Sequence, residues 1–169
     1  MEPSTWGIDC MGHRRAAGGA RSGFTVIEML AVVMIIGVLA GLGIPRLHEA
    51  IERAKVARAI GEINAIQWDL MAIESQNQPL PATLAAIGRG GMRDPWGYPY
   101  VYYPFPATHG HGHPPGARMD RFLVPLNSTF DLYSVGKDGA SAAPLTAQQS
   151  QDDIIRANDG GFIGQGKDF

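Results

Sequence analysis

A long apolar run near the N-terminus limits what this chain can fold into more than any other feature. Residues 29–44 contain no charged and no polar side chain, and the wider segment 24–44 is interrupted only by Thr25 and Glu28. At about 1.5 Å rise per residue, a helix over the wider segment spans ~31 Å, which matches the hydrocarbon core of a bilayer. Because only a helix satisfies its own backbone hydrogen bonds in lipid, we expect a membrane-spanning helix here.

The charges before the run predict its orientation. Arg14, Arg15 and Arg21 precede it, and positive residues favour the cytoplasmic side, so the rest of the chain is expected across the membrane. Two other interpretations stay open, a secretory signal peptide cleaved near residues 39–41 and a plain signal anchor. Neither explains Glu28, because an ionisable group inside a membrane span is costly and normally has a partner.

The residues at the start of the run form the motif SGFTVIEML, preceded by a basic segment. This motif resembles the cleavage signal of the type IV pilin and type II secretion pseudopilin family. The resemblance implies a leader of residues 1–23, whose translation starts at the first methionine or at Met11. It also implies that a prepilin peptidase cuts between Gly23 and Phe24 and that Phe24 becomes the N-methylated first residue.

The resemblance further implies that Glu28 and Pro45 act in filament assembly. In this family, the segment that corresponds to residues 24–45 is both the membrane anchor and the filament core. A carboxylate buried among apolar helices needs a cation, and the new amine of Phe24 in a neighbouring subunit can supply it. Pro45 removes a backbone donor and weakens the helix locally, while the G-x-x-x-G pair at residues 37–41 permits close helix packing.

Residues 46–78 continue as an amphipathic helix. Apolar side chains recur there at helical spacing, and charged side chains occupy the other positions. The apolar stripe consists of Ala59, Ile60, Ile63, Ile66, Leu70 and Ile73. We therefore expect one helix over residues 24–76, with this stripe packed against a globular head.

The head, residues 79–169, is expected to be rich in β-structure. A short helical turn that Thr83 caps comes first. Aromatic and β-branched residues predict strands at 98–103 and 130–135, and a third strand at 122–126 stays open. The predicted fold class is α+β, a long N-terminal helix that spans the membrane in its first half and packs on a small antiparallel sheet.

Two motifs in the head sharpen the resemblance. The sequence DPWGYPY at residues 94–100 and the sequence FDLYSVGKDG at residues 130–139 are similar to segments of the major pseudopilins of type II secretion. Those proteins hold a calcium ion in the loop that follows, and calcium prefers six to eight oxygen ligands. The resemblance implies as ligands the side chain of Asp138, the carbonyl of Val135 and a later acid, Asp152 or Asp153.

The chain departs from the family pattern beside this predicted calcium site. The loop at residues 139–151 lacks the family's glycine-rich acidic run, and the tail lacks the closing tryptophan. A plain turn at Asp138, followed by a solvated pair of Asp152 and Asp153, is therefore the alternative to a calcium site.

Composition excludes several other classes of function. The single cysteine, Cys10, lies in the leader, so no internal disulfide forms. A net charge of −2 argues against a nucleic-acid-binding protein. No motif activates Ser128, Ser134 or Ser141, so we predict no catalytic residue. The alternating histidines of residues 109–113 are compatible with a metal site, or with an inserted surface loop.

These features predict a structural protein and not an enzyme. We expect a subunit of a periplasmic pseudopilus, which forms a helical homo-oligomeric filament from a single-pass anchor in the inner membrane. Its expected partners are the prepilin peptidase, the inner-membrane assembly platform, minor pseudopilins and the membrane itself. The alternatives are a type IV pilin for adhesion, twitching or DNA uptake, and a membrane-anchored periplasmic domain that binds metal.

Overall fold

The computed structural model describes residues 23–106 and 114–169. The chain divides into two compact units, an N-terminal unit that ends at Gly43 and a C-terminal unit, Ile44–Phe169. The predictions for the basic leader and for the histidines of residues 109–113 lie outside the described residues. The predicted boundaries at residues 23, 45 and 78 stay predictions.

One long helix, α1 (Val26–Ser75), carries the first part of the described chain. It begins two residues after the predicted start and ends one residue before the predicted end, and Pro45 lies within it. Proline at this place removes one backbone hydrogen bond, and the neighbouring turns hold the helix together. The sequence-based prediction of a single helix over residues 24–76 is confirmed.

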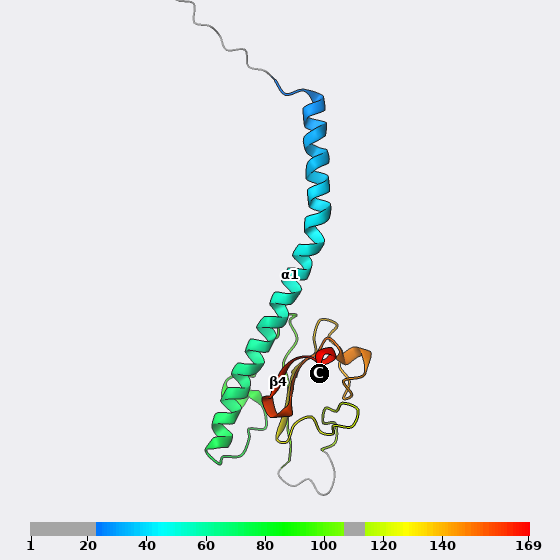
Figure 1. Cartoon of the computed structure of the whole chain (residues 1–169). Coiled ribbons are helices and arrows are strands. Elements are labelled where there is room, and N and C mark those ends of the chain that lie inside the picture. Colours follow the sequence, from blue (N-terminus) through cyan, green and yellow to red (C-terminus); the bar gives the residue numbers. More distant parts are fainter. Residues whose placement is uncertain (1–22, 107–113) are drawn as a thin grey trace, which may run out of the picture. The chain divides into compact units, whose positions relative to one another are not determined.

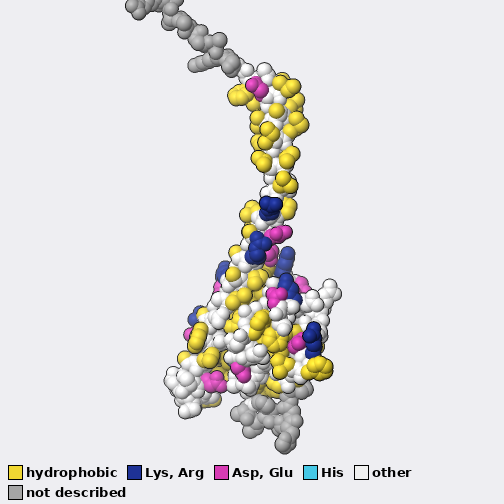
Figure 2. Space-filling model, viewed as in Figure 1, with side chains coloured by type: hydrophobic (Ala, Val, Ile, Leu, Met, Phe, Trp, Pro, Cys, Tyr) yellow, Lys and Arg dark blue, Asp and Glu magenta, His cyan; other side chains and the backbone are white. Residues whose placement is uncertain are grey.

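The N-terminal unit has an apolar surface. Its large hydrophobic side chains between Phe24 and Leu42 are 44–80% exposed. Figure 2 shows hydrophobic side chains over most of the visible face of this unit. Among the described residues, α1 is the one helix long and apolar enough to cross a membrane. An apolar surface of this extent normally marks contact with lipid or with other proteins.

In the C-terminal unit, α1 buries the predicted apolar stripe. Ala59, Ile63, Ile66 and Leu70 are fully buried, and the flanking residues of the stripe, Ile60 and Ile73, are partly buried. The helix lies beside the sheet in Figure 1. The buried stripe confirms the amphipathic pattern, because a 3.6-residue period places these side chains on one face.

Four short strands form an antiparallel sheet in the order β1-β2-β3-β4. The strands are β1 (Val101–Pro104), β2 (Phe130–Ser134), β3 (Ile154–Ala157) and β4 (Phe162–Gln165). Phe130, Leu132 and Ile154 pack with the apolar stripe of α1. A second cluster contains Ile155 and Ala157 together with loop residues. The α+β fold with a helix on a small antiparallel sheet is thus confirmed.

The strand left open at residues 122–126 is absent, and the predicted Thr83 cap is wrong. Residues 122–126 form no strand, because the chain turns back where Asp120 and Leu123 exchange backbone hydrogen bonds, and Pro125 has no N–H to donate. Thr83 stands at the N-cap of the short 3-10 helix η1 (Leu84–Ile87), but its side chain makes no capping hydrogen bond. The backbone turn and the packing of Leu84 and Ile87 in the core hold this short helix.

Candidate functional site

The predicted cleavage site lies just before α1. Gly23, Phe24 and Thr25 precede the helix, and Phe24 is 80% exposed. An accessible segment outside regular secondary structure suits a peptidase, since the scissile bond must enter its active site. Cleavage between Gly23 and Phe24 and methylation of Phe24 stay predictions.

Glu28 is part of a capping box at the start of α1. Its Oε2 accepts hydrogen bonds from the backbone N–H and from the hydroxyl of Thr25, both at 2.8 Å. The Thr25 hydroxyl oxygen in turn accepts the backbone N–H of Glu28 at 3.3 Å. This reciprocal pairing satisfies N–H groups that a helix start otherwise leaves free.

The charge of Glu28 has no basic partner nearby in sequence. From Phe24 to Pro45 the chain contains no lysine, arginine or histidine. The capping box therefore satisfies the hydrogen-bonding capacity of one carboxylate oxygen and leaves the negative charge uncompensated. The T-x-x-E pattern at residues 25–28 is a signal for this cap that the sequence analysis overlooked.

Two glycines of the N-terminal unit have open space around them. A methyl group placed at Gly37 or Gly41 would meet nothing within 4 Å. Glycine is therefore not required at either position by contacts within the described chain. Small residues four apart on an apolar helix are typical of surfaces where helices approach closely.

In the C-terminal unit, the structure brings the two head motifs together. The Ser134 hydroxyl donates to Asp94 Oδ2 at 2.5 Å. Asp94 Oδ1 accepts the backbone N–H groups of Trp96 and Tyr98, at 3.1 and 2.8 Å. Asp94 is buried, so these bonds remove the cost of burying its carboxylate. The predicted turn in the first motif is confirmed, with Gly97 at φ +101°.

The loop predicted to bind calcium is a tight turn held by Asp152. Asp152 Oδ2 accepts the backbone N–H groups of Lys137 and Asp138, at 2.8 and 3.0 Å. Gly136 has φ +67°, and a Cβ there would lie 2.6 Å from the Asp152 carbonyl oxygen. Only glycine fits this close approach, which explains its place between Val135 and Lys137.

Asp153 faces away from this turn toward an internal cation. It is fully buried, and its Oδ2 lies 2.6 Å from Nη2 of the buried Arg118. Ser141 donates a hydrogen bond to the same oxygen at 2.6 Å. Burial raises the pKa of Asp153, while the bond from Ser141 and the charge of Arg118 act in the opposite direction. The alternative of a solvated acidic pair is wrong for Asp153.

Of the two acids offered as the later calcium ligand, Asp152 lies at the turn with Asp138 and Asp153 does not. Asp138 and Asp152 meet at the turn, and Asp138 Oδ1 accepts the backbone N–H of Ala140 at 2.8 Å. Asp153 pairs with Arg118 instead. Within residues 23–106 and 114–169, no three histidine, cysteine or acidic side chains are placed to hold a metal ion. Asp153 is thus occupied by an internal ion pair, and a calcium site that uses Val135, Asp138 and Asp152 stays a prediction.

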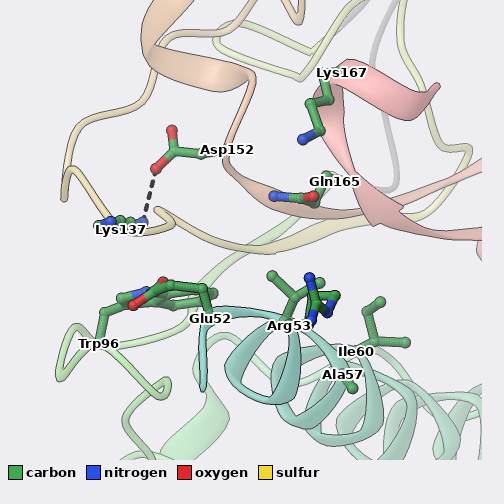
Figure 3. Close-up of a pocket in the computed structure, with 10 residues that line it drawn as sticks. Glu52, Arg53, Ala57, Ile60, Trp96, Lys137, Asp152, Gln165 and Lys167 are labelled. Carbon is green, nitrogen blue, oxygen red and sulfur yellow. Dashed lines mark hydrogen bonds between the residues drawn. The ribbon is translucent and has the colours of Figure 1, made fainter. Parts of the chain in front are cut away.

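A pocket of about 400 Å³ lies beside this turn (Figure 3). Trp96 forms one wall, and its indole N–H donates to Glu52 Oε2 at 3.1 Å. Figure 3 shows Lys137 and Asp152 on the opposite side, joined through the backbone of Lys137. Charged side chains of both signs surround an apolar floor that includes Ile60. Such a pocket can hold a side chain through apolar contact and ion pairs.

Most of the chain is similar to secretion proteins. It is 34% identical to type II secretion system core protein G of Pseudomonas aeruginosa over 140 residues, which cover 70% of this chain and 85% of that protein. The chain belongs to the type II secretion system core protein G family. The protein of the same name from Klebsiella pneumoniae is 28% identical over 137 residues, 78% of this chain and 91% of that protein.

A shorter similarity links the chain to pilins. A fimbrial protein of Pseudomonas aeruginosa is 44% identical over 48 residues, which cover 28% of this chain and 31% of that protein. No protein-family model matches the chain. No solved structure matches it either. The similarity over most of the chain therefore rests on core protein G.

Several buried polar residues of this chain were not predicted. Arg156 is buried, its Nε donates to Gln67 Oε1 at 2.8 Å, and its guanidinium lies 4.0 Å from the centre of the Phe130 ring. Asp131 accepts the backbone N–H of Arg118 at 2.6 Å, and burial raises its pKa. Arginine and aspartate normally lie on the surface, so no sequence signal marks these as buried.

Proposed function

We propose that this chain is a structural subunit of a type II secretion pseudopilus. It enters the inner membrane through residues 24–45, with its C-terminal unit in the periplasm. The prepilin peptidase then cuts between Gly23 and Phe24 and methylates the new amine of Phe24. Processed subunits polymerise into a helical filament from the inner-membrane assembly platform, together with minor pseudopilins.

The uncompensated charge of Glu28 carries this proposal. A carboxylate within an apolar filament core needs a cation, and no side chain between Phe24 and Pro45 supplies one. The amine of Phe24, freed by cleavage, is a positive charge at the start of the same segment of a neighbouring subunit. Glu28 thus favours subunits that are cleaved and placed in the correct register.

The exposed surface of the N-terminal unit supports polymerisation as well. Its apolar side chains and the open space at Gly37 and Gly41 suit first the lipid and then the helices of other subunits. The same apolar surface can therefore contact lipid in the membrane and other helices in the filament.

Mass spectrometry of the membrane-extracted protein tests the proposal. In cells with an active prepilin peptidase, the chain should begin at N-methyl-Phe24, and in cells without the peptidase it should keep its leader. A Gly23→Val variant should stay uncut in both. An intact leader on the wild-type chain in cells with active peptidase would refute the proposal.

A type IV pilin is the second candidate, supported by the fimbrial match over 48 residues. The two candidates differ in what is lost when the chain is deleted. A pseudopilin is required for release of secreted enzymes, whereas a pilin is required for surface fibres, twitching or DNA uptake. Loss of twitching with normal secretion would favour the pilin.

A further inference from the structure

Arg118 is fixed inside the C-terminal unit by its own backbone. Its side chain is 3% exposed. Its N–H donates to Asp131 Oδ2 on β2 at 2.6 Å, and its carbonyl accepts the N–H of Leu126 at 2.9 Å. The residue lies in the connection between β1 and β2. These two hydrogen bonds fix the position of its backbone in the C-terminal unit.

The guanidinium of Arg118 forms a cluster with Asp153 and Ser141. Nη2 lies 2.6 Å from Asp153 Oδ2, and Nη1 is hydrogen bonded to the Ser141 hydroxyl. Ser141 donates to the same Asp153 oxygen at 2.6 Å. The Tyr133 ring lies against the guanidinium, 4.3 Å from its carbon to the ring centre, which adds a cation–π contact.

We infer that the guanidinium of Arg118 supplies, inside this chain, the positive charge at Asp153, which is one of the two acids that the family resemblance offers as the later calcium ligand. The charge of arginine is permanent at all ordinary pH values, and its planar group suits a carboxylate partner. A divalent ion bound to the same carboxylate would lie close to the guanidinium in a medium of low polarity, where like charges repel strongly. The stability of the C-terminal unit is therefore independent of calcium at Asp153.

The other acids of the loop, Asp138 and Asp152, bind backbone N–H groups, and among the described residues neither forms a hydrogen bond or an ion pair with Arg118. Asp152 Oδ2 holds the backbone of the turn, and Asp138 Oδ1 accepts the N–H of Ala140. Within the described part of the chain, Asp153 Oδ1 has no hydrogen-bond partner. That oxygen is the one point at which a divalent ion could still reach this carboxylate, so the experiment must test it.

Thermal unfolding of the full chain in detergent, followed by near-ultraviolet circular dichroism, tests the inference. Any difference in melting temperature between excess EDTA and millimolar calcium should be the same in wild type and in Asp153→Asn. Arg118→Met should lower it by about 10 °C or more, because it leaves a buried carboxylate unpaired. A matched change at an exposed neighbour, Arg121→Met, should leave it unchanged. If chelation lowers the wild-type melting temperature and Asp153→Asn removes that response, the inference is wrong.

A double variant separates the pair from a general loss of packing. Arg118→Met combined with Asp153→Leu removes both charges, and it should melt well above Arg118→Met alone. Additive losses would contradict the pairing. If Arg118→Met does not fold, calorimetric titration with calcium still decides the matter. If wild type and Asp153→Asn bind calcium equally, the inference is supported. If wild type binds calcium and Asp153→Asn does not, the inference is overturned.

Discussion

The two units of this molecule treat a carboxylate in opposite ways. In the N-terminal unit, Glu28 is exposed and lies in a segment without a basic residue. In the C-terminal unit, Asp153 is fully buried and lies 2.6 Å from Arg118 of the same chain. The C-terminal unit thus completes its own ion pair, whereas the N-terminal unit leaves a charge for another molecule to neutralise.

Apolar side chains show the same contrast. The C-terminal unit buries its large aliphatic and aromatic residues in two clusters. The N-terminal unit exposes side chains of the same types along α1. One unit is stable through contacts within the chain, and the other requires lipid or further copies of the chain to cover it. Variants that affect one unit and spare the other test this division.

The largest expected effect on stability is at the centre of the C-terminal unit. Phe130→Ala should lower the free energy of unfolding by about 3–5 kcal/mol, because it opens a cavity beside Tyr102 and Arg156. Val33→Ala in the exposed part of α1 should change it by less than about 0.5 kcal/mol. Denaturant unfolding of both variants in detergent checks this, and equal losses would contradict the division.

A smaller loss is expected where the two head motifs meet. Asp94→Ala removes three hydrogen bonds and leaves the Ser134 hydroxyl without the acceptor of its proton. We expect a loss of about 2–3 kcal/mol in denaturant unfolding. Asp168→Ala, at an exposed position, serves as the matched control and should behave as wild type. A stable Asp94→Ala variant would show that the motifs do not depend on this carboxylate.

Alkaline pH should destabilise the C-terminal unit alone. Burial raises the pKa of Tyr102 to about 12, and burial with the hydrogen bond to Glu62 raises that of Tyr100 further. Above pH ~10 the unfolded chain loses these protons while the folded chain keeps them, so stability falls as pH rises toward 12. Melting temperatures across this range should fall less for Tyr102→Phe than for wild type. Parallel curves would contradict the assigned cause.

The smallest effect is expected on the exposed face of α1. Glu49 and Arg53 form an ion pair at 3.7 Å, and both side chains are about 70% exposed. Arg53→Ala should lower the free energy of unfolding by about 0.5 kcal/mol or less. A loss above about 1 kcal/mol in denaturant unfolding would show that this face of the helix has a role within the single chain.

The elements with a clear period could be predicted from the sequence. The apolar run and the stripe from Ala59 to Leu70 gave α1 almost to the residue, because a helix repeats over many turns. The strands predicted at residues 98–103 and 130–135 correspond to β1 and β2. The motif beginning at Asp94 gave the turn.

What remained hidden depends on contacts between distant parts of the chain. The strand β3 is buried at all four positions, so it lacks the alternation that marks a half-exposed strand. The short strand β4 contains Gly164, which weakens any strand signal. Arg118 and Asp153 are 35 residues apart, and only the fold shows that they meet.

The most direct test of the account separates the charge of Glu28 from its capping role. Glu28→Gln keeps a side chain that can cap α1 but carries no charge, whereas Thr25→Val removes the cap and keeps the charge. The amount of filament sheared from cells should fall about tenfold or more for Glu28→Gln and much less for Thr25→Val, with the head melting as in wild type. Normal assembly of Glu28→Gln together with loss of assembly in Thr25→Val would contradict the account.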